Sequence, residues 1–266
     1  PSVGPGNILS DLIKSDLFTY NPLNIIYRQS ENSYIPLLAK EIKNKELTES
    51  FLEKKDDYNF IKCDSEDIKK TIESIVIHGL DKGLNEENLQ ILAPMYRGEN
   101  GIDNLNLTIK EIFNPGSKKS VRYGDIQYKV DDKVLQLVND TDNYVFNGDI
   151  GFIKSIETDL KGKDKITIDF DGNYVIYEKK DLKNIRHAYA ITVHKSQGSE
   201  FDHVIMPITI NYGAMLYNKL IYTGVSRAKK SLILVGEPVV FSRAIQNDYG
   251  SERKTSLKEK LINSYK

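Results

Sequence analysis

Two stretches in the last third of the chain carry residue types suited to binding or transferring phosphate. Residues 189–201 read YAITVHKSQGSEF, and residues 221–229 read IYTGVSRAK. Each stretch passes from apolar residues typical of a strand to polar residues compatible with a helix. Open α/β sheets bind ligands where their strands end, and helix N-termini there favour phosphate. The two stretches together therefore predict one part of a nucleotide-dependent protein.

Arg227 is the residue of the second stretch best suited to catalysis. Its guanidinium stays charged and can bind two phosphate oxygens at once, so it could stabilise charge that develops during phosphoryl transfer. The apolar residues before it predict a helix over residues 216–229 that packs on a sheet. A surface arginine paired with a carboxylate is the alternative, and on spacing alone it is the more common case.

The first stretch places hydroxyl, imidazole and carboxylate groups close together. Thr192, His194, Ser196 and Gly198 could bind a nucleotide or the phosphates of a nucleic-acid strand, and Glu200 could accept hydrogen bonds from ribose hydroxyls. The alternative is a helix start in which a hydroxyl only caps the helix and the histidine lies on the surface. A serine hydrolase is excluded because the chain contains no Gly-x-Ser-x-Gly sequence.

Two earlier apolar runs are also followed by cations. Arg28 follows residues 23–27 and could make a second phosphate contact. Tyr96 and Arg97 follow residues 89–94, and they could stack a base and bind a backbone phosphate. The alternatives are a solvated arginine at a helix start and an ordinary surface loop.

The rest of the composition limits the possible functions. No Gly-x-x-x-x-Gly-Lys-[Ser/Thr] sequence and no Asp-Glu pair after an apolar run occur, so the chain cannot be a complete P-loop ATPase. The 37 basic and 38 acidic residues nearly cancel, which neither supports nor excludes a nucleic-acid partner. Cys63 is the single cysteine and cannot form an internal disulfide. No membrane-spanning run or signal-peptide pattern is seen, so we expect a cytoplasmic protein.

The elements that must position these residues follow from hydrophobic periodicity. Alternating apolar runs and helical patterns predict a parallel sheet with crossover helices. The predicted strands are 23–27, 58–63, 89–94, 202–208 and 231–236, and the predicted helices are 8–18, 30–42, 101–112 and one beginning at Asp64 or Ser65. Since the chain starts with Pro1 rather than Met, we expect it to be part of a longer protein.

The pattern changes between residues 117 and 186. Apolar and polar residues alternate over 133–138 and 165–170, and turn sequences separate these short runs. Such spacing is typical of a small antiparallel barrel. We therefore expect an α/β fold whose parallel sheet comes from residues 1–116 and 187–266, with a barrel inserted at 117–186.

The chain resembles the C-terminal part of superfamily 1 DNA helicases of the RecD-like group (the exodeoxyribonuclease V alpha type). The matching segments follow the family's order over essentially the whole chain. Residues 1–7 resemble the end of the third helicase motif, 26–29 the fourth, 92–101 a segment lining the DNA channel, 190–201 the fifth, 222–229 the sixth, and 146–149 the SH3-like subdomain.

The resemblance implies a role for each matching position. Arg227 would be the arginine finger, Arg28 a second γ-phosphate contact, and Gln29, Gly198 and Glu200 further contacts with ATP. The residues that would contact single-stranded DNA are Arg97, Thr192, His194 and Ser196.

The resemblance also implies the fold and the partners. The fold would be a second RecA-like domain carrying an SH3-like β-barrel. ATP and Mg²⁺ would be held mainly by an upstream RecA-like domain of the same protein, so the chain alone would not hydrolyse ATP at a useful rate. The substrate would be single-stranded DNA or a duplex with a 5′ tail, traversed 5′ to 3′, and no membrane would be involved.

Two other functions remain open. A non-enzymatic module could bind single-stranded nucleic acid with a helicase-derived fold. An unrelated α/β enzyme could instead use His194 and Glu200 as acid and base, and it would need turnover by this chain alone.

Overall fold

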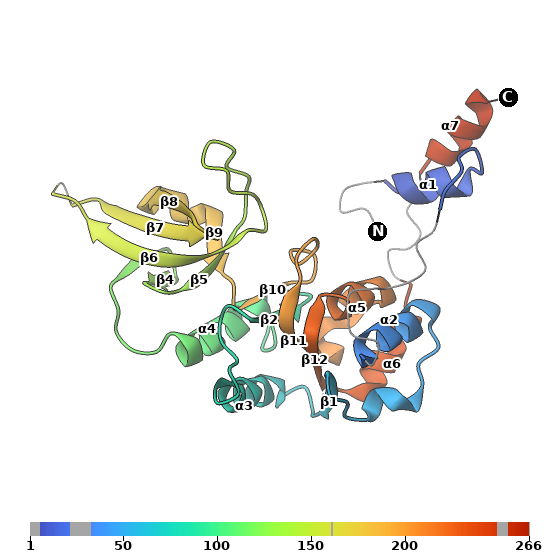
Figure 1. Ribbon diagram of the computed structural model, residues 1–266, viewed down its shortest axis with the longest axis horizontal. Coiled ribbons are helices and arrows are strands. Elements are labelled where there is room, and N and C mark those ends of the chain that lie inside the picture. The colour runs from blue at the N-terminus through green and yellow to red at the C-terminus, as the bar shows by residue number, and fades with distance from the viewer. Residues whose placement is uncertain (1–5, 22–32, 161, 249–254, 266) are drawn as a thin grey trace.

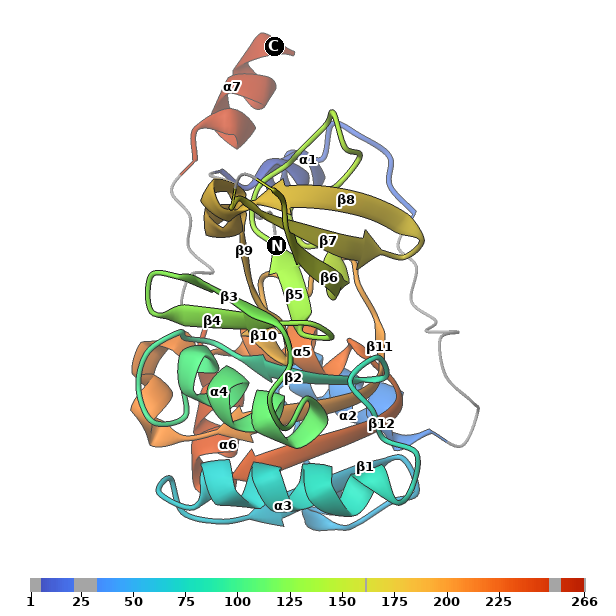
Figure 2. The same cartoon turned by 90° about the vertical axis from the view of Figure 1, so that its left-hand side faces the viewer.

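A computed structural model describes residues 6–21, 33–160, 162–248 and 255–265. The predicted strand at 23–27, together with Arg28 and Gln29, lies outside the described residues. Figures 1 and 2 show two layered parts joined side by side, with helices α1 (Ile8–Lys14) and α7 (Leu257–Ser264) packed on each other away from the larger part.

The larger part is built on a five-stranded parallel sheet in the order β1-β12-β11-β2-β10. Its strands are β1 (Tyr58–Lys62), β2 (Leu89–Ala93), β10 (Ala190–Thr192), β11 (Phe201–Ile208) and β12 (Ala228–Gly236). All five residues of β2 are buried. Strands covered on both faces are mostly apolar, which is why the apolar runs in the sequence predicted them.

Helices cover both faces of this sheet. Figure 2 shows α3 (Ile68–Leu80) and α4 (Ile102–Phe113) together on one face, while α2 (Tyr34–Asn44), α5 (Asn218–Val225) and α6 (Pro238–Gln246) lie on the other. Each helix presents an apolar stripe to the sheet, as the periodicity predicts. The shorter 3₁₀ segments are η1 (Glu49–Leu52) and η3 (Ile210–Met215). The predicted α/β fold with a RecA-like parallel sheet is confirmed.

The smaller part comes from the insert, residues 117–186, and extends to the end of β9 at His187. A hairpin of β3 (Ser120–Tyr123) and β4 (Ile126–Lys129) packs beside a five-stranded antiparallel sheet in the order β8-β7-β6-β5-β9. The strands of that sheet are β5 (Lys133–Gln136), β6 (Ile150–Thr158), β7 (Asp164–Phe170), β8 (Asn173–Glu178) and β9 (Ile185–His187), with η2 (Lys179–Asn184) before β9. Its apolar side chains form a core of their own. The boundaries between the two parts stay a prediction.

Two local predictions about helices were wrong. Helix α5 ends at Val225, so that Arg227 lies in a turn before β12, and α3 begins at Ile68 after Asp67 rather than at Asp64 or Ser65. Residues 193–198, whose polar composition is compatible with a helix, form turns. Local side-chain bonds compete with a helix there, because Thr192 Oγ1 accepts from the backbone N–H of Lys195 at 3.1 Å.

Candidate nucleotide and nucleic-acid site

The two motif stretches meet the parallel sheet at opposite ends of its strands. Thr192 pairs with Ala93 where β10 and β2 finish. Arg227 immediately precedes Ala228, which pairs with Phe201 where β12 and β11 begin. Ala190 aligns with Ile205 through Ile91, so Thr192 lies about six residues, or ~20 Å, further along the strands than Phe201.

This arrangement corrects the expectation that every site residue lies where strands finish. Glu200 and Arg227 lie at the amino ends of β11 and β12 instead. The reason is that the chain reverses between Thr192 and Phe201, crossing from the finish of one strand to the start of another. We call residues 193–200 the connecting loop, since it joins the two ends of the site.

At the C-terminal end of β10 the site side chains are of two kinds, exposed and buried. His194 is exposed and faces solvent. Ser196 is fully buried, and its hydroxyl donates to the backbone carbonyl of Val193 at 2.8 Å. Thr192 is 8% exposed and accepts from a backbone N–H within the turn. In this conformation the two hydroxyls therefore shape the connecting loop, while the imidazole is available to a ligand.

The loop after β2 lies beside this turn, because β2 and β10 are neighbours in the sheet. Tyr96 and Arg97 are exposed there. The loop folds tightly over the start of α4: a Cβ on Gly101 would come within 2.4 Å of Tyr96 O and 2.5 Å of Arg97 O. Glycine at position 101 thus allows the backbone to hold Arg97 on the same edge as Thr192 and His194.

At the amino end of β12, the guanidinium of Arg227 makes three hydrogen bonds to neighbouring residues. Its Nε donates to Thr223 O at 3.1 Å, its Nη1 to Ser199 O at 3.0 Å and its Nη2 to Ser226 Oγ at 3.0 Å. The guanidinium is partly exposed and bridges the connecting loop to the end of α5. This contact brings the two motif stretches together in space.

Glu200 and Gly198 lie on the connecting loop near this guanidinium. Glu200 Oε2 is 3.9 Å from Lys229 Nζ, and both side chains are partly exposed. Gly198 has a φ of +92°, a conformation that glycine adopts readily, and a Cβ there would meet no atom within 4 Å. Space therefore remains beside the loop for a ligand to approach the backbone.

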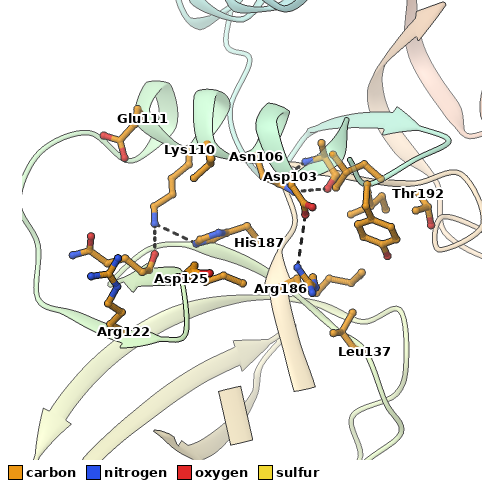
Figure 3. A pocket seen from close by; sticks show the side chains of 18 residues that line it. Asp103, Asn106, Lys110, Glu111, Arg122, Asp125, Leu137, Arg186, His187 and Thr192 are labelled. Carbon is orange, nitrogen blue, oxygen red and sulfur yellow. Dashed lines mark hydrogen bonds and ion pairs between the residues drawn. The ribbon is translucent and has the colours of Figure 1, made fainter. Parts of the chain in front are cut away.

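A cavity of about 450 Å³ opens between the two parts of the molecule. Figure 3 shows α4 on one side and the β3–β4 hairpin on the other, with Thr192 at one end of the lining. Near that end, Arg186 Nη1 lies 3.7 Å from Asp103 Oδ1, and Arg186 Cζ lies 6.0 Å from the centre of the Tyr96 ring. Sequence reasoning missed Arg186, because it belongs to the insert side of the chain.

A buried ionic cluster adjoins this cavity, and two of its residues, Lys110 and His187, line the cavity wall. Asp132 is fully buried, and its Oδ2 lies 2.8 Å from Lys110 Nζ and 3.0 Å from His187 Nε2. Burial raises the pKa of Asp132, but hydrogen bonds from His187, Lys110 and the backbone N–H of Lys129 outweigh it and hold the pKa below its ordinary value. The cluster ties α4 of the larger part to β4, to the turn before β5 and to β9 of the smaller part.

Comparison with known families agrees with this two-part architecture. The family described as UvrD-like helicase C-terminal domain matches residues 187–235, which include β10, the connecting loop and Arg227. The family described as ATP-dependent RecD-like DNA helicase SH3 domain matches residues 105–170. In these segments the chain is similar to the C-terminal part of RecD-like helicases. The predicted SH3-like character of the insert is thereby confirmed.

Individual relatives of this RecD-like chain carry related names. The ATP-dependent RecD2 DNA helicase of Deinococcus radiodurans is 34% identical over 173 residues, which cover 65% of this chain and 23% of that protein. The RecBCD enzyme subunit RecD of Buchnera aphidicola is 28% identical over 247 residues, covering 84% of this chain and 40% of the subunit. The RecD-like chain therefore spans well under half the length of these relatives.

A solved structure of two coordinating Pif1 helicases at forked double-stranded DNA shares the fold. Its TM-score is 0.50 at 16% identity, and the match covers 91% of the RecD-like chain and 53% of that chain. In the described parts of the molecule, no helix is long and apolar enough to cross a membrane.

Proposed function

We propose that this chain is the C-terminal motor domain of an ATP-dependent DNA helicase that moves 5′ to 3′. The observation that supports this most is the placement of the site residues at two ends of one sheet, joined by the connecting loop. A motor needs such a division, since one end must respond to the nucleotide and the other must grip the strand. The helicase names of the relatives agree with the proposal.

The nucleotide end would use Arg227 as the arginine finger. A guanidinium beside the γ-phosphate stabilises charge that develops on the transferred group. Glu200 would accept from the ribose hydroxyls and Gly198 would lie against the nucleotide. Arg28 and Gln29, outside the described residues, would add a second phosphate contact and a further ATP contact.

The triphosphate and Mg²⁺ would be held mainly by an upstream P-loop domain of the same protein. The residues of this chain would respond to a nucleotide held by that domain, and we expect this chain alone to be inactive as an ATPase.

The strand end would use Arg97 and His194 as direct contacts. Both side chains are exposed on one edge, where a backbone of phosphates could run past them. Thr192 would contact the strand beside them, and Ser196 would contribute mainly through the shape of the loop that its buried hydroxyl maintains. Such residues contact the phosphate backbone rather than the bases, so binding would depend little on the nucleotide sequence.

The connecting loop would couple the two ends. When a closing interface draws Arg227 toward a nucleotide, the hydrogen bond to Ser199 O pulls on the same loop that carries His194. Closure and reopening would then shift the strand contacts of this domain relative to those of its neighbour.

Unwinding by the intact protein tests this proposal. Fluorescently labelled duplexes with a 5′ tail, a 3′ tail or blunt ends are mixed with protein and ATP. We expect strand separation on the 5′-tailed duplex only, and none by the 266-residue chain alone. Binding of single strands by the intact protein with no ATP-dependent separation of any duplex would favour a non-enzymatic binding module instead.

A further inference from the structure

The β5–β6 loop of the insert reaches the connecting loop of the larger part. Lys195 Nζ donates to Asn147 Oδ1, although the two residues lie far apart in the sequence. A Cβ on Gly148 would lie 3.8 Å from Lys195 O, so the two backbones also come close. The turn 146–149 is therefore a neighbour of the strand end of the site.

This turn is held firmly by its own hydrogen bonds. The backbone N–H of Phe146 donates to Asp149 Oδ2 at 2.7 Å, and the N–H of Asp149 donates back to Phe146 O at 3.0 Å. Asn147 N donates to Asn139 Oδ1 at 2.9 Å, and Gly148 N to Gln136 O at 2.9 Å. A fixed turn loses little conformational entropy when a ligand binds, which favours its use as a contact surface.

Phe146 is the exposed aromatic residue of this turn. Its side chain is 47% exposed, whereas the insert buries its core aromatics almost completely, with Tyr128 at 0% and Tyr177 at 3%. The neighbouring residue Asn147 points to Lys195, and His194 beside it is also exposed. An exposed aromatic ring beside a cation and an imidazole is the composition of a single-strand stacking site.

We propose that Phe146 stacks on a base of the bound single strand, so that the insert contributes to the strand-binding surface. Lys195 and His194 lie beside this turn on the connecting loop and would contact the phosphates. Burial lowers the pKa of Lys195, and the hydrogen bond to Asn147 keeps its ammonium at this junction. The proposal rests on the proposed strand-binding function and assigns a residue of the insert to it.

The test measures binding of a fluorescein-labelled oligo-dT to the 266-residue chain by anisotropy. Loss of one stacked base weakens binding by about 1–3 kcal/mol, so Phe146→Ala should raise Kd roughly 5- to 150-fold. Phe146→Trp should preserve affinity. Tyr174→Ala is the control, because Tyr174 is an even more exposed aromatic (62% against 47% for Phe146) on the edge strand β8, and this substitution should leave Kd unchanged.

Salt dependence separates stacking from charge. Phe146→Ala should leave the slope of log K against log salt unchanged, while Arg97→Ala should reduce it by about 0.7. A 5-iodouracil oligonucleotide should also cross-link to the peptide containing Phe146. An unchanged Kd for Phe146→Ala, with Arg97→Ala still weakening binding, would overturn the stacking assignment and leave strand binding intact. Absence of any strand binding by the unsubstituted chain would overturn both.

Discussion

Arg227 Nη1 donates to the backbone carbonyl of Ser199 at 3.0 Å, and this bond joins the two motif stretches of the chain. Ser199 belongs to the loop that begins at Thr192, so the cation at one end of the sheet is connected by a short segment to the polar edge at the other. The distance between the ends is set by the parallel strands. In the proposed cycle, the loop would be the element through which a change at one end reaches the other.

Glu200 should contribute to ATP affinity without affecting the strand. Substitution Glu200→Gln in the intact protein removes a charged acceptor, and hydrogen bonds to charged groups contribute about 1.5–3 kcal/mol. We expect KM for ATP to rise about tenfold or more, while the affinity for oligo-dT stays within about twofold. Steady-state phosphate release at saturating DNA measures the first quantity.

Asp202→Asn is the control for Glu200. Asp202 lies two residues further on and pairs with Lys230 at 2.8 Å on the surface. The substitution Asp202→Asn should leave KM for ATP unchanged. Equal effects of the two substitutions would show that the charge of the region, rather than a specific contact of Glu200, determines ATP affinity.

The buried cluster around Asp132 should be essential for stability. Asp132→Asn leaves the Lys110 ammonium buried without its counter-ion, which costs about 3–5 kcal/mol of unfolding free energy. Its neighbour Asp131 pairs with Lys118 at the exposed surface, so Asp131→Asn should cost less than about 1 kcal/mol. Urea unfolding followed by far-UV circular dichroism compares them, and a loss below 1 kcal/mol for Asp132→Asn would contradict the role of the cluster.

Lys133 should make stability depend on pH. Its Nζ is fully enclosed and donates to Glu86 O, Leu89 O and Gln90 Oε1, and burial lowers its pKa from 10.5 to about 7. Between these two values the unfolded chain binds more protons than the folded chain. The contribution of Lys133 to stability therefore rises with pH from about 7 to 10, by at most about 1.4 kcal/mol per unit.

Lys133→Met provides the comparison for this pH effect. The difference in unfolding free energy between the protein and the variant should grow in favour of the unsubstituted protein from pH 7 to pH 9. Lys118→Met, at an exposed position, should show no such trend. A constant difference for Lys133→Met across this range would mean that Lys133 is a protonated ammonium in the fold.

The sequence predicted the sheet better than it predicted the site. Runs such as 89–94 and 204–208 are almost entirely apolar because their strands are buried on both faces, so composition alone reveals them. The polar residues 194–198 carry no hydrophobic period, and the turns that they form depend on local bonds such as those of Thr192 and Ser196. Which end of a strand a residue occupies depends on pairing between distant segments, such as Phe201 with Ala228.

The ionic cluster was missed for a related reason. Lys110, Asp132 and His187 come from three separate segments, and nothing in the spacing connects them. One signal was present: Lys110 falls on the buried stripe of α4, after Ile102, Leu105 and Ile109. A lysine at a core position requires a partner, which could have prompted a search for a buried carboxylate.

The proposal assigns the nucleotide response to one end of the sheet and strand binding to the other. Comparing Arg227→Ala with Arg97→Ala in the intact protein tests this assignment most directly. ATP turnover is measured as a function of single-strand concentration. Arg227→Ala should lower the maximal rate by about 10³-fold or more, as removal of an arginine finger does, with Kd for the strand within about twofold. Arg97→Ala should raise the half-saturating strand concentration severalfold and leave the maximal rate nearly unchanged. Normal turnover in Arg227→Ala, or loss of strand affinity in both variants alike, would contradict the account.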